Sequence, residues 1–496
     1  MKQCYIGVDV GLTSAKAGAF DEAGEEVRTF SAPNPRYAAA AGQQEIDMQL
    51  LWQVVASVLS DLTSWLRENG WTPVSLGVTA AGNGIYLVDE ELKPVRPAIA
   101  SNDNRAEAIV ANLDPHDVEG VRKITGSVPW AGQPGVLLSW LVENEPDSVE
   151  AAHHMLTCKD WVRTNLIGRA GAEVSDASAC GLMSLESRAY EARHFDLLGL
   201  PRELMRLLPP LAASDEVVGT VTDVAARETG LPVGLPVVAG CLDCIASPIG
   251  AGSIDESEVT VIVGTWAINS VTVPIDREPP NVTLNALLPT PSVMAAMEVA
   301  PTSAASIEWF ASLMSSVAPD GVTPPQLLHA ASTVAAGADG LMFLPFIHGA
   351  PEHFGASGTF IGLKAHHGYH EMARAVAEGI TQYHRHQLER MSRTSVLTEG
   401  PWTLAGGGAR NALWAQLFAD IVDHPVRRQL GTELGARGVA LLAAAGVGAD
   451  TASWEIDPDP KLVVEPGPDR EIYREQSRRF DKAIAAMSAV WTEIES

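Results

Sequence analysis

Two aspartates follow predicted buried strands, and each could take part in proton or phosphate chemistry. Asp9 ends the apolar run 5–8 and precedes a turn at 11–14, whose backbone N–H groups and hydroxyls can face phosphate oxygens. Asp243 follows a short strand predicted at 235–240, and ligands of open α/β sheets bind at this carboxyl edge. The simpler interpretations are an ordinary hairpin aspartate at position 9 and a helix cap at position 243.

Two further glycine turns could face a nucleotide, although the common phosphate-binding loops are missing from the sequence. No Gly-Lys dipeptide occurs, which excludes a Walker-type loop, and no G-x-G-x-x-G follows the first strand. A β-rich run at 259–263 ends in Gly264 and Thr265, and a strand at 403–405 runs into three glycines at 406–408. Consecutive glycines are entropically unfavourable unless something needs the space, and a flexible strand-to-helix turn is the alternative.

The elements that must position these residues alternate between strands and helices. Residues 5–10 predict a buried strand that forms a hairpin with a second strand at 16–20. Apolar residues recur at helical spacing over 48–68, which predicts an amphipathic helix. Further elements are predicted as strands at 76–79 and 85–88 and as a long helix at 371–390. This alternation is typical of an α/β fold.

The composition indicates a folded chain with at least two cores. With 496 residues the chain exceeds the usual domain size, and 46% hydrophobic and 19% charged residues exclude a disordered protein. The net charge of −27 argues against nucleic acid or an anionic membrane as a partner. The longest apolar run, 439–447, is too short to span a bilayer, and Asp9 interrupts the N-terminal apolar stretch. We therefore expect a cytoplasmic protein without a secretory signal.

Cysteine and histidine groups allow other interpretations. The five cysteines are an odd number and favour reduced thiols, although Cys241 and Cys244 form a C-x-x-C that could be a redox pair. Histidines gather in a polar loop and on a helical face that we predict to be exposed, so we interpret them as surface residues rather than metal ligands. They are His366, His367 and His370 in the loop and His384 and His386 on the helix.

Taken in order, these residues resemble the FGGY family of carbohydrate kinases, within the actin, sugar-kinase and Hsp70 superfamily. The resemblance covers essentially the whole chain. It rests on residues 9–16, Asp243, the turn at 264–265 and residues 406–411. In addition, residues 155–162 match the central signature of the family and residues 435–440 match its late helix.

The resemblance implies a fold of two ribonuclease-H-like actin-type α/β lobes with an active-site cleft between them. Residues 1–250 would form the N-terminal lobe, with the sugar site, the phosphate site and the catalytic base. Residues 251–496 would form the C-terminal lobe and bind ATP through its adenosine. In agreement, residues 259–266 repeat the plan of the first strand and turn.

The resemblance also implies a role for each candidate residue. Asp243 would take the proton of the attacking sugar hydroxyl as catalytic base, and Asp9 would hold Mg²⁺ through water. ATP would be bound by Gly11, Thr13, Ser14, Lys16, Gly264, Thr265, Gly406, Gly407, Gly408 and Asn411. The sugar would be bound by Asp103, as in xylulokinase-like members, together with Arg105, Asn83 and Gly82. For Asn83, a turn residue with a left-handed backbone is the alternative.

Within the family, the sequence is similar to xylulokinases and especially to the L-xylulose and 3-keto-L-gulonate kinase branch. Residues 80–84 and 130–134 resemble that branch, and Trp266 stands where a serine is usual. Residues 346–352 depart from a segment that many relatives share.

The predicted function is ATP-dependent phosphorylation of L-xylulose or a related ketopentose. D-xylulose or an erythritol-type polyol are alternative acceptors, and an actin-like, nucleotide-dependent sugar sensor is the non-enzymatic alternative. A homodimer without nucleic acid or membrane partners is expected.

Overall fold

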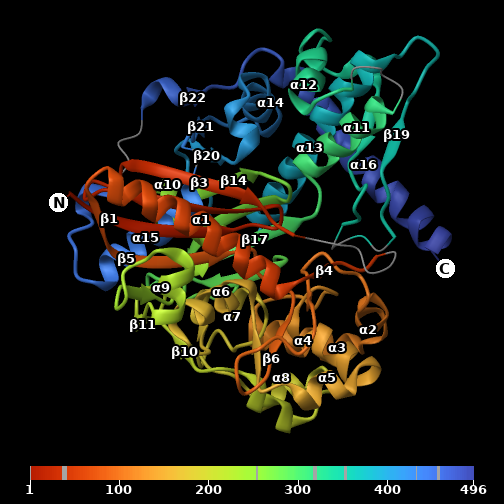
Figure 1. Ribbon diagram of the computed structural model, residues 1–496. Helices are drawn as coiled ribbons and strands as arrows, with labels where there is room; N and C mark the ends of the chain where they lie inside the picture. The colour runs from red at the N-terminus through yellow and green to blue at the C-terminus, as the bar shows by residue number, and fades with distance from the viewer. Residues whose placement is uncertain are drawn as a thin grey trace.

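The computed structural model of the protein contains two mixed β-sheets with helices on their faces (Figure 1). It describes residues 2–35, 42–252, 255–316, 321–350, 353, 355–431, 433–454 and 459–495. Within these ranges, every helix is too short or too polar to span a lipid bilayer. Pro351 and Glu352, which belong to the segment that departs from the family pattern, lie outside the described residues.

The first sheet is built on the predicted N-terminal hairpin. β1 (Lys2–Val10) pairs antiparallel with β2 (Ser14–Phe20) and parallel with β5 (Trp71–Ala80), which is longer than the strand predicted at 76–79. Because β1 and β5 are parallel, their carboxyl ends meet at one edge of the sheet. The other strands of this sheet are β3 (Glu26–Pro33), β11 (Val217–Thr220), β12 (Pro236–Val238) and β13 (Cys241–Leu242).

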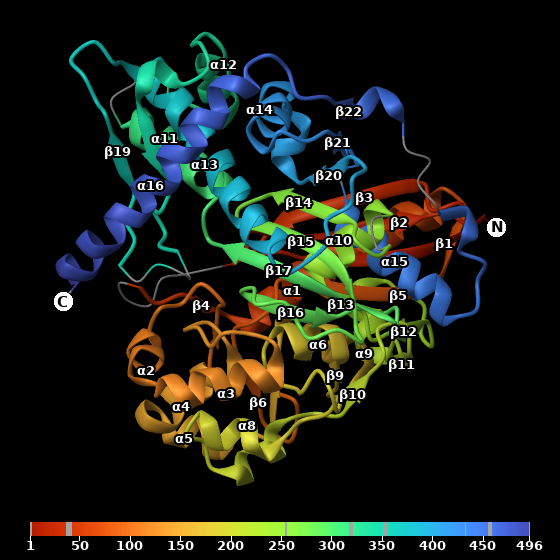
Figure 2. The ribbon, with the colours of Figure 1, turned by 180° about the vertical axis from the view of Figure 1, so that it is seen from behind.

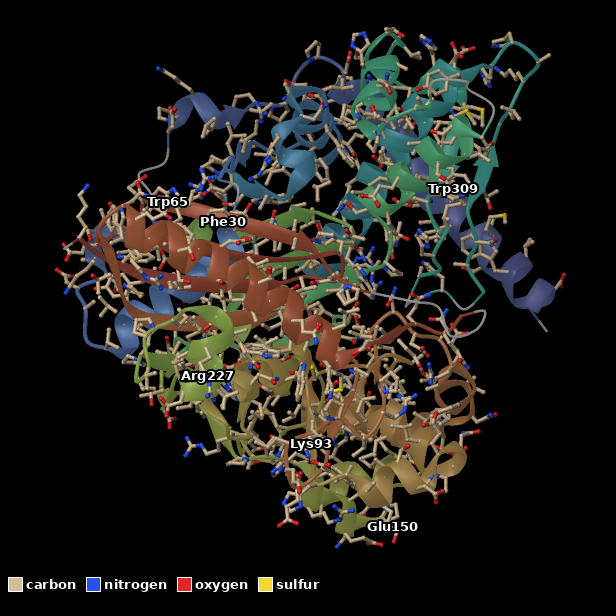
Figure 3. The ribbon with its side chains drawn as sticks, viewed as in Figure 1. Phe30, Trp65, Lys93, Glu150, Arg227 and Trp309 are labelled. Carbon is tan, nitrogen blue, oxygen red and sulfur yellow. The ribbon has the colours of Figure 1, made fainter. Side chains whose placement is uncertain are left out.

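Helix α1 (Met48–Glu68) covers one face of the first sheet and has the bounds that the hydrophobic periodicity predicts. Asp47 caps it, because its carboxylate accepts two backbone N–H groups of the first turn. Figure 3 shows Trp65 of this helix and Phe30 of β3 close to each other. The guanidinium of Arg28 lies 5.0 Å from the ring centroid of Phe30 and 5.9 Å from that of Trp65, and it ties the helix to the edge of the sheet.

The second sheet repeats the strand pairing of the first. β14 (Val259–Val263) pairs antiparallel with β15 (Ala267–Pro274) and parallel with β20 (Trp402–Ala405). The repeat that the sequence indicated at 259–266 is therefore present in the structure. The other strands of this sheet are β16 (Leu284–Leu287), β17 (Val293–Ala300), β21 (Val426–Arg428) and β22 (Val463–Val464).

A layer of short helices lies below the first sheet in Figure 1 and has an apolar core of its own. In this layer, the loop before α4 carries Trp130, a residue of the candidate active site. The helices of this region are α2 (Glu107–Asn112), α3 (Pro115–Thr125), α4 (Pro134–Asn144), α5 (Pro146–Ala151), α6 (Cys158–Ile167), α7 (Val174–Ala179), α8 (Ala192–Leu197) and α9 (Asp223–Thr229). Its short strands are β4 (Glu45–Ile46), β6 (Tyr86–Val88), β7 (Ala98–Ile99), β8 (His154–Leu156), β9 (Ala172–Glu173) and β10 (Leu211–Ala212).

The second sheet is covered by a group of longer helices. The central one is α13 (Tyr369–Ser392), which extends the helix predicted at 371–390. Its neighbours are α11 (Ala304–Ser315), α12 (Pro324–Ser332), α14 (Ala412–Val422) and α16 (Arg470–Glu495), with the short strands β18 (Met342–Leu344) and β19 (Thr359–Ile361).

Two helices cross where the sheets approach each other, α10 (Asp243–Ala251) and α15 (Leu434–Gly446) (Figure 2). The crossing is close because each helix has a glycine at the contact. A Cβ at Gly250 would lie 2.0 Å from the carbonyl oxygen of Leu434, and one at Gly438 would lie 1.9 Å from that of Ala246. Only glycine permits this backbone-to-backbone contact.

One sequence prediction near Asp243 needs correction, and the alternative of a redox pair at Cys241 and Cys244 is not supported. The strand predicted at 235–240 is interrupted, because Gly240 adopts a φ of +77° and a Cβ there would lie 1.9 Å from the carbonyl oxygen of Val78. The short strand β13 therefore leads to Asp243 instead. Cys241 and Cys244 are both buried free thiols, and burial raises their pKa well above the ordinary thiol value. These inert thiols do not support a redox pair.

The prediction of surface histidines is wrong in part. His384 is fully buried within α13, where its ring nitrogens lie 3.2 Å from Ser303 Oγ and 2.9 Å from Asn269 Oδ1. The side chain of His367 is also buried, whereas His366 is exposed. The Nδ1 atom of His367 accepts the N–H of Lys364, so a neutral ring presents an Nε2–H group, not a lone pair, to Asp339. The ligand atoms of Asp339, His366 and His367 nevertheless lie within 4.8 Å of one another, a grouping that the sequence interpretation did not foresee.

Candidate active site

A cavity of about 300 Å³ lies between the two sheets and collects the predicted catalytic and phosphate-binding residues. We call it the acceptor cavity. The carboxyl end of β1 and the following turn form one wall, and the turn after β14 forms the opposite wall. The predicted site residues that line it are Asp9, Gly11, Thr13, Ser14, Lys16, Gly82, Asn83, Asp243, Gly264 and Thr265.

Asp9 stands at the end of β1 and faces the N-terminal end of α15. A Cβ at Gly435 would lie 2.5 Å from Asp9 Oδ2, so glycine is needed for this approach. Lys16 Nζ forms an ion pair with Glu433 Oε2 at 2.9 Å. Burial raises the pKa of Asp9 to about 6, whereas Lys16 acts in the opposite direction and Glu433 adds to the rise. The half-buried carboxylate is thus short of counter-charge, which suits a cation.

Asp243 is the first residue of α10 and faces the same cavity. Its Oδ1 atom accepts the N–H of the next residue, Cys244, at 2.6 Å, but Leu242 occupies the N-cap position of α10, so the helix-cap interpretation is not supported. Burial, followed by the charge of Asp9, raises the pKa of Asp243 to about 7; Asp176 adds to the rise and the Cys244 N–H opposes it. A carboxyl group with this pKa accepts a proton more readily than an ordinary aspartate does.

A second cavity, of about 530 Å³, adjoins the first and is called the donor cavity. Gly264 and Thr265 line both cavities, so the two cavities lie against the same turn. Gly407, Gly408 and Asn411 line the donor cavity, together with other residues. Those others are Val263, Ala304, Ile307, Glu308, Pro324, Pro325, Leu328, Arg410 and Trp414.

The three glycines after β20 have different surroundings. A Cβ at Gly407 would meet no atom within 4 Å, so this position leaves an open wall. At Gly408 a Cβ would lie 2.4 Å from Val263 Cγ1, and at Gly406 it would lie 2.7 Å from the Val263 carbonyl oxygen. Gly406 and Gly408 are therefore needed for packing against β14, and Gly406 lies outside the lining of either cavity.

Two predicted sugar-binding residues, Asp103 and Arg105, lie outside the lining of the acceptor cavity. Asp103 is buried, and its Oδ1 accepts the N–H and Nε–H of Arg105 while its Oδ2 accepts Arg105 Nη2 and the N–H of Gln44. Arg105 also pairs with Glu45 at 3.0 Å. In this conformation the pair holds the loop that carries Ser101, which does line the cavity.

The other two predicted sugar-binding residues, Gly82 and Asn83, line the cavity. Asn83 also has the left-handed backbone of the alternative interpretation, with a φ of 61°. Its buried Oδ1 atom has no hydrogen-bond partner within the described part of the chain. Because this oxygen is buried, a hydroxyl group could bond to it only after the surrounding atoms move.

Sequence reasoning did not predict that two tryptophans, Trp130 and Trp266, come together at the cavity. Trp130 comes from the helical layer under the first sheet and Trp266 from the turn after β14, and both line the cavity. Their ring centroids lie 5.9 Å apart in an edge-to-face arrangement. The two residues are far apart in sequence, so no local pattern could have paired them.

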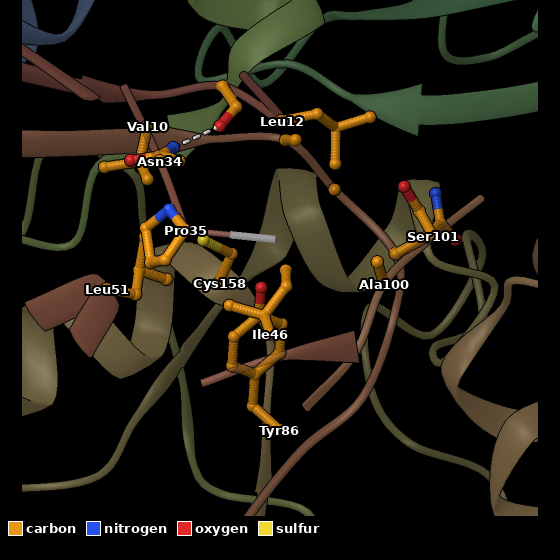
Figure 4. Close-up of a pocket in the computed structure, with 14 residues that line it drawn as sticks. Val10, Leu12, Asn34, Pro35, Ile46, Leu51, Tyr86, Ala100, Ser101 and Cys158 are labelled. Carbon is orange, nitrogen blue, oxygen red and sulfur yellow. Dashed lines mark hydrogen bonds between the residues drawn. The ribbon is translucent and has the colours of Figure 1, made fainter. Parts of the chain in front are cut away.

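A smaller cavity of about 20 Å³ lies behind the turn at 11–14 and shares Gly11, Gly82 and Asn83 with the acceptor cavity (Figure 4). Asn34, another residue without a sequence signal, fixes this turn. Its Nδ2 donates to the carbonyl oxygen of Gly11 at 2.6 Å, and its backbone N–H donates to that of Thr13 at 2.9 Å. The turn is therefore held from behind, which keeps its N–H groups directed for a ligand.

The residues present suit ATP and a hard cation. The donor cavity is large enough for a nucleoside and has a side-chain-free wall at Gly407. Two glycine turns, at 11–14 and 264–265, face the acceptor cavity from opposite sheets. Asp9 supplies carboxylate oxygens, the ligand type that Mg²⁺ prefers.

Comparison with known proteins defines the class. The model of the FGGY family of carbohydrate kinases, N-terminal domain, matches residues 4–250, and the C-terminal domain of the same family matches residues 259–447. The chain therefore belongs to the FGGY family of carbohydrate kinases. It is a sugar kinase, a phosphotransferase that uses ATP, and the resemblance of its motifs to this family is confirmed.

Individual relatives are similar to this chain over nearly its full length. The chain is 29% identical over 489 residues to a probable L-xylulose kinase of Pasteurella multocida, covering 98% of this chain and 99% of the relative. It is 29% identical over 502 residues to the L-xylulose/3-keto-L-gulonate kinase of Escherichia coli, covering 100% and 99%. The crystal structure of xylulose kinase from Rhodospirillum rubrum superimposes with a TM-score of 0.85 at 28% identity, covering 99% and 100%. The two-lobed actin-type fold is thereby confirmed.

Proposed function

We propose that this kinase transfers the γ-phosphate of ATP to a hydroxyl of a small ketose, L-xylulose or a related ketopentose, with Asp243 as the general base. The substrate class is supported by full-length similarity to kinases named for L-xylulose. The roles proposed for Asp9 and Asp243 are supported by one observation: both side chains line the same cavity as the glycine turns of the two sheets.

In the transfer, Asp243 accepts the proton of the sugar hydroxyl as its oxygen attacks the γ-phosphorus. The bond between that phosphorus and the bridging oxygen of ADP breaks, and ADP leaves. A pKa of about 7 makes Asp243 a stronger base than an ordinary aspartate, while leaving it partly ionised at neutral pH. Its position at the N-terminus of α10 also favours the charged form.

Asp9 holds Mg²⁺ through water in this proposal. When bound, the ion would neutralise charge on the β- and γ-phosphates. The turn at 11–14, with Lys16, and the turn at 264–265 bracket the phosphates, and Gly407, Gly408 and Asn411 face the adenosine. On this basis residues 1–250 supply the base and most of the sugar and phosphate sites, and residues 251–496 supply the adenosine site together with the turn at 264–265 and Trp266.

The two tryptophans give the acceptor cavity an apolar side. Aromatic rings of this kind pack against the C–H face of a sugar, while Asn83 and Ser101 can bond its hydroxyls. Discrimination between L-xylulose, D-xylulose and erythritol therefore depends on how each places its hydroxyls against these polar atoms.

A coupled ATP-turnover screen over ketopentoses, hexuloses and polyols tests the proposal. We expect L-xylulose or a related ketopentose to give the highest kcat/KM, and Asp243→Asn to lower kcat by about 100-fold or more, because a positioned base contributes that much. Asp61→Asn, on the exposed side of α1, is the matched control. Absence of stimulation by every sugar, or an Asp243→Asn variant with the full rate, would contradict the proposal.

A further inference from the structure

A cluster of five charged side chains lies buried behind the acceptor cavity, and no step of the proposed transfer uses it. Lys159 Nζ lies 2.6 Å from Asp160 Oδ1, 3.7 Å from Asp176 Oδ2 and 3.9 Å from Glu173 Oε2. Arg163 Nη2 lies 3.0 Å from Asp160 Oδ1. None of the five side chains is more than 3% exposed. Two cations therefore face three carboxylates without water.

One of these carboxylates connects to the segment that carries the base. Glu173 Oε2 accepts the hydroxyl of Ser175 at 2.8 Å, and Ser175 Oγ in turn accepts the backbone N–H of Leu242 at 3.2 Å. Glu173 is further held by Ser214, whose hydroxyl donates to Oε1 at 2.5 Å. Leu242 immediately precedes Asp243, so this chain of hydrogen bonds ends beside the proposed base.

A second carboxylate connects in the same manner to the proposed sugar-binding turn. Asp176 Oδ1 accepts the thiol of Cys180 at 3.3 Å, and the Cys180 sulfur accepts the backbone N–H of Asn83 at 3.2 Å. Asp176 Oδ2 accepts the hydroxyl of Thr157 at 2.6 Å. Burial raises the pKa of Cys180 well above its ordinary value, so the thiol keeps the proton that it donates.

We propose that Lys159 is a positioning residue for phosphoryl transfer that acts through these two carboxylates. Its ammonium group lies within 4 Å of Glu173 and Asp176 and favours their ionised forms, which accept the hydrogen bonds of the two paths. The Glu173–Ser175 path fixes the segment before the base and thereby sets kcat. The Asp176–Cys180 path fixes the turn at Asn83 and thereby sets the KM for the sugar. The kinetic half of this inference rests on the proposed function, whereas the structural half does not.

The electrostatics of the cluster support this role. Burial raises the pKa of both Glu173 and Asp176, and for each of them Lys159 is the strongest influence in the opposite direction. A protonated carboxyl would lose part of its acceptor capacity and could turn its O–H toward Ser175 or Cys180. A buried cation close to both carboxylates opposes this protonation.

Substitutions in the two paths test the inference without removing a charge. In Ser175→Ala we expect faster amide hydrogen–deuterium exchange in peptides that cover 241–244, and a kcat about tenfold lower with an unchanged sugar KM. In Cys180→Ala we expect faster exchange in peptides that cover 82–84, and a sugar KM about tenfold higher with an unchanged kcat. Cys180→Ser keeps a donor and an acceptor and should restore most of both properties.

The matched control is Thr164→Val on α6, whose buried hydroxyl has no hydrogen-bond partner within the described residues. Lys159→Met should accelerate amide hydrogen–deuterium exchange in both segments, 241–244 and 82–84. If this variant does not fold, Ser175→Ala and Cys180→Ala, which keep every charge, decide. Wild-type exchange in folded Ser175→Ala and Cys180→Ala, or in folded Lys159→Met, overturns the inference. Faster exchange with unchanged kcat and KM overturns its kinetic half. If the wild type phosphorylates no sugar, the proposed function fails, while the exchange data still test the two paths.

Discussion

The two sheets contain the same hairpin and differ in what they place at its turn. β1 pairs antiparallel with β2 and parallel with β5, and β14 pairs in the same way with β15 and β20. The first hairpin carries Asp9 and Lys16 at the cavity, whereas the second carries Gly264, Thr265 and Trp266. A repeated backbone thus gives a charged wall on one side of the cleft and an uncharged wall on the other.

This difference suggests a division of work between the walls. In the proposed mechanism, Asp9 on the first wall and Asp243 at the start of α10 act on the phosphate and on the proton that moves, so the loss of either carboxylate should lower kcat. The second wall offers backbone and an aromatic ring, so changes there should alter the KM of a substrate. The variants of Asp9 and Trp266 test this division, that of Gly407 tests the donor cavity, and that of Asp243 tests its raised pKa; they follow from the largest expected effect to the smallest.

Asp9→Asn should have the largest effect of this series. It removes a charge from the first wall while keeping the shape of the side chain, and we expect kcat to fall by about 100-fold. The half-saturating Mg²⁺ concentration should rise as well, because an amide is a weaker ligand than a carboxylate. A magnesium titration of the coupled assay measures both. Unchanged kcat and unchanged magnesium dependence would show that the charge of Asp9 has no part in the transfer.

Gly407→Leu should raise the KM for ATP by about tenfold and leave kcat nearly unchanged, since the added side chain enters the open wall of the donor cavity. Gly408→Ala is the matched comparison. Its methyl group meets Val263 Cγ1 at 2.4 Å, so the thermal midpoint should fall. An unchanged KM for ATP in Gly407→Leu would exclude this cavity as the nucleotide site.

Trp266→Ala should raise the KM for the sugar by about fivefold, with the KM for ATP unchanged, because it removes one of the two facing rings. Trp266→Phe retains a ring and should recover most of the loss. Initial rates at varied sugar and fixed ATP separate the two constants. A change confined to the KM for ATP would assign this residue to the donor side of the turn.

Asp243→Asn should have a small, pH-dependent effect on stability. The pKa of about 7 in the folded state exceeds the ordinary value of 3.8, so the folded wild type retains a proton that the unfolded chain loses between these pH values. Wild-type stability therefore falls as the pH rises through this window. Asparagine does not titrate, so the variant does not lose stability in this way. The Tm of the variant minus the Tm of the wild type should therefore increase by a few degrees from pH 4.5 to pH 7.5. A pH-independent difference would contradict the raised pKa.

Local patterns predicted the parts of the fold whose signal is local. The periodicity over 48–68 predicted the bounds of α1, and the turns after β1, β14 and β20 were recognisable as strand ends followed by glycine or a hydroxyl residue. The same reasoning failed for His384. Polar neighbours suggested an exposed face, but in α13 the flanking Arg385 and Gln387 are buried and paired as well.

The candidate site was predictable only where one segment supplies a motif. Lys16 was recognised, but its partner Glu433 lies on the far part of the chain, and the same holds for Trp130 and Trp266. Asp103 was placed in the sugar site by its resemblance to the xylulokinase-like members of the family. Its contacts with Arg105 depend on how the loop folds back, which spacing alone does not reveal.

The close crossing of α10 and α15 bears on how the cleft could close. At Gly250 and Gly438 the two backbones touch without intervening side chains, so there is no compressible layer that would let one helix slide along the other. A rotation of one helix against the other about this point keeps both contacts, Gly250 with Leu434 and Gly438 with Ala246. We therefore expect the two lobes to rotate as rigid bodies about this contact. A methyl group at position 250 or 438 would push the two backbones apart and hinder this rotation.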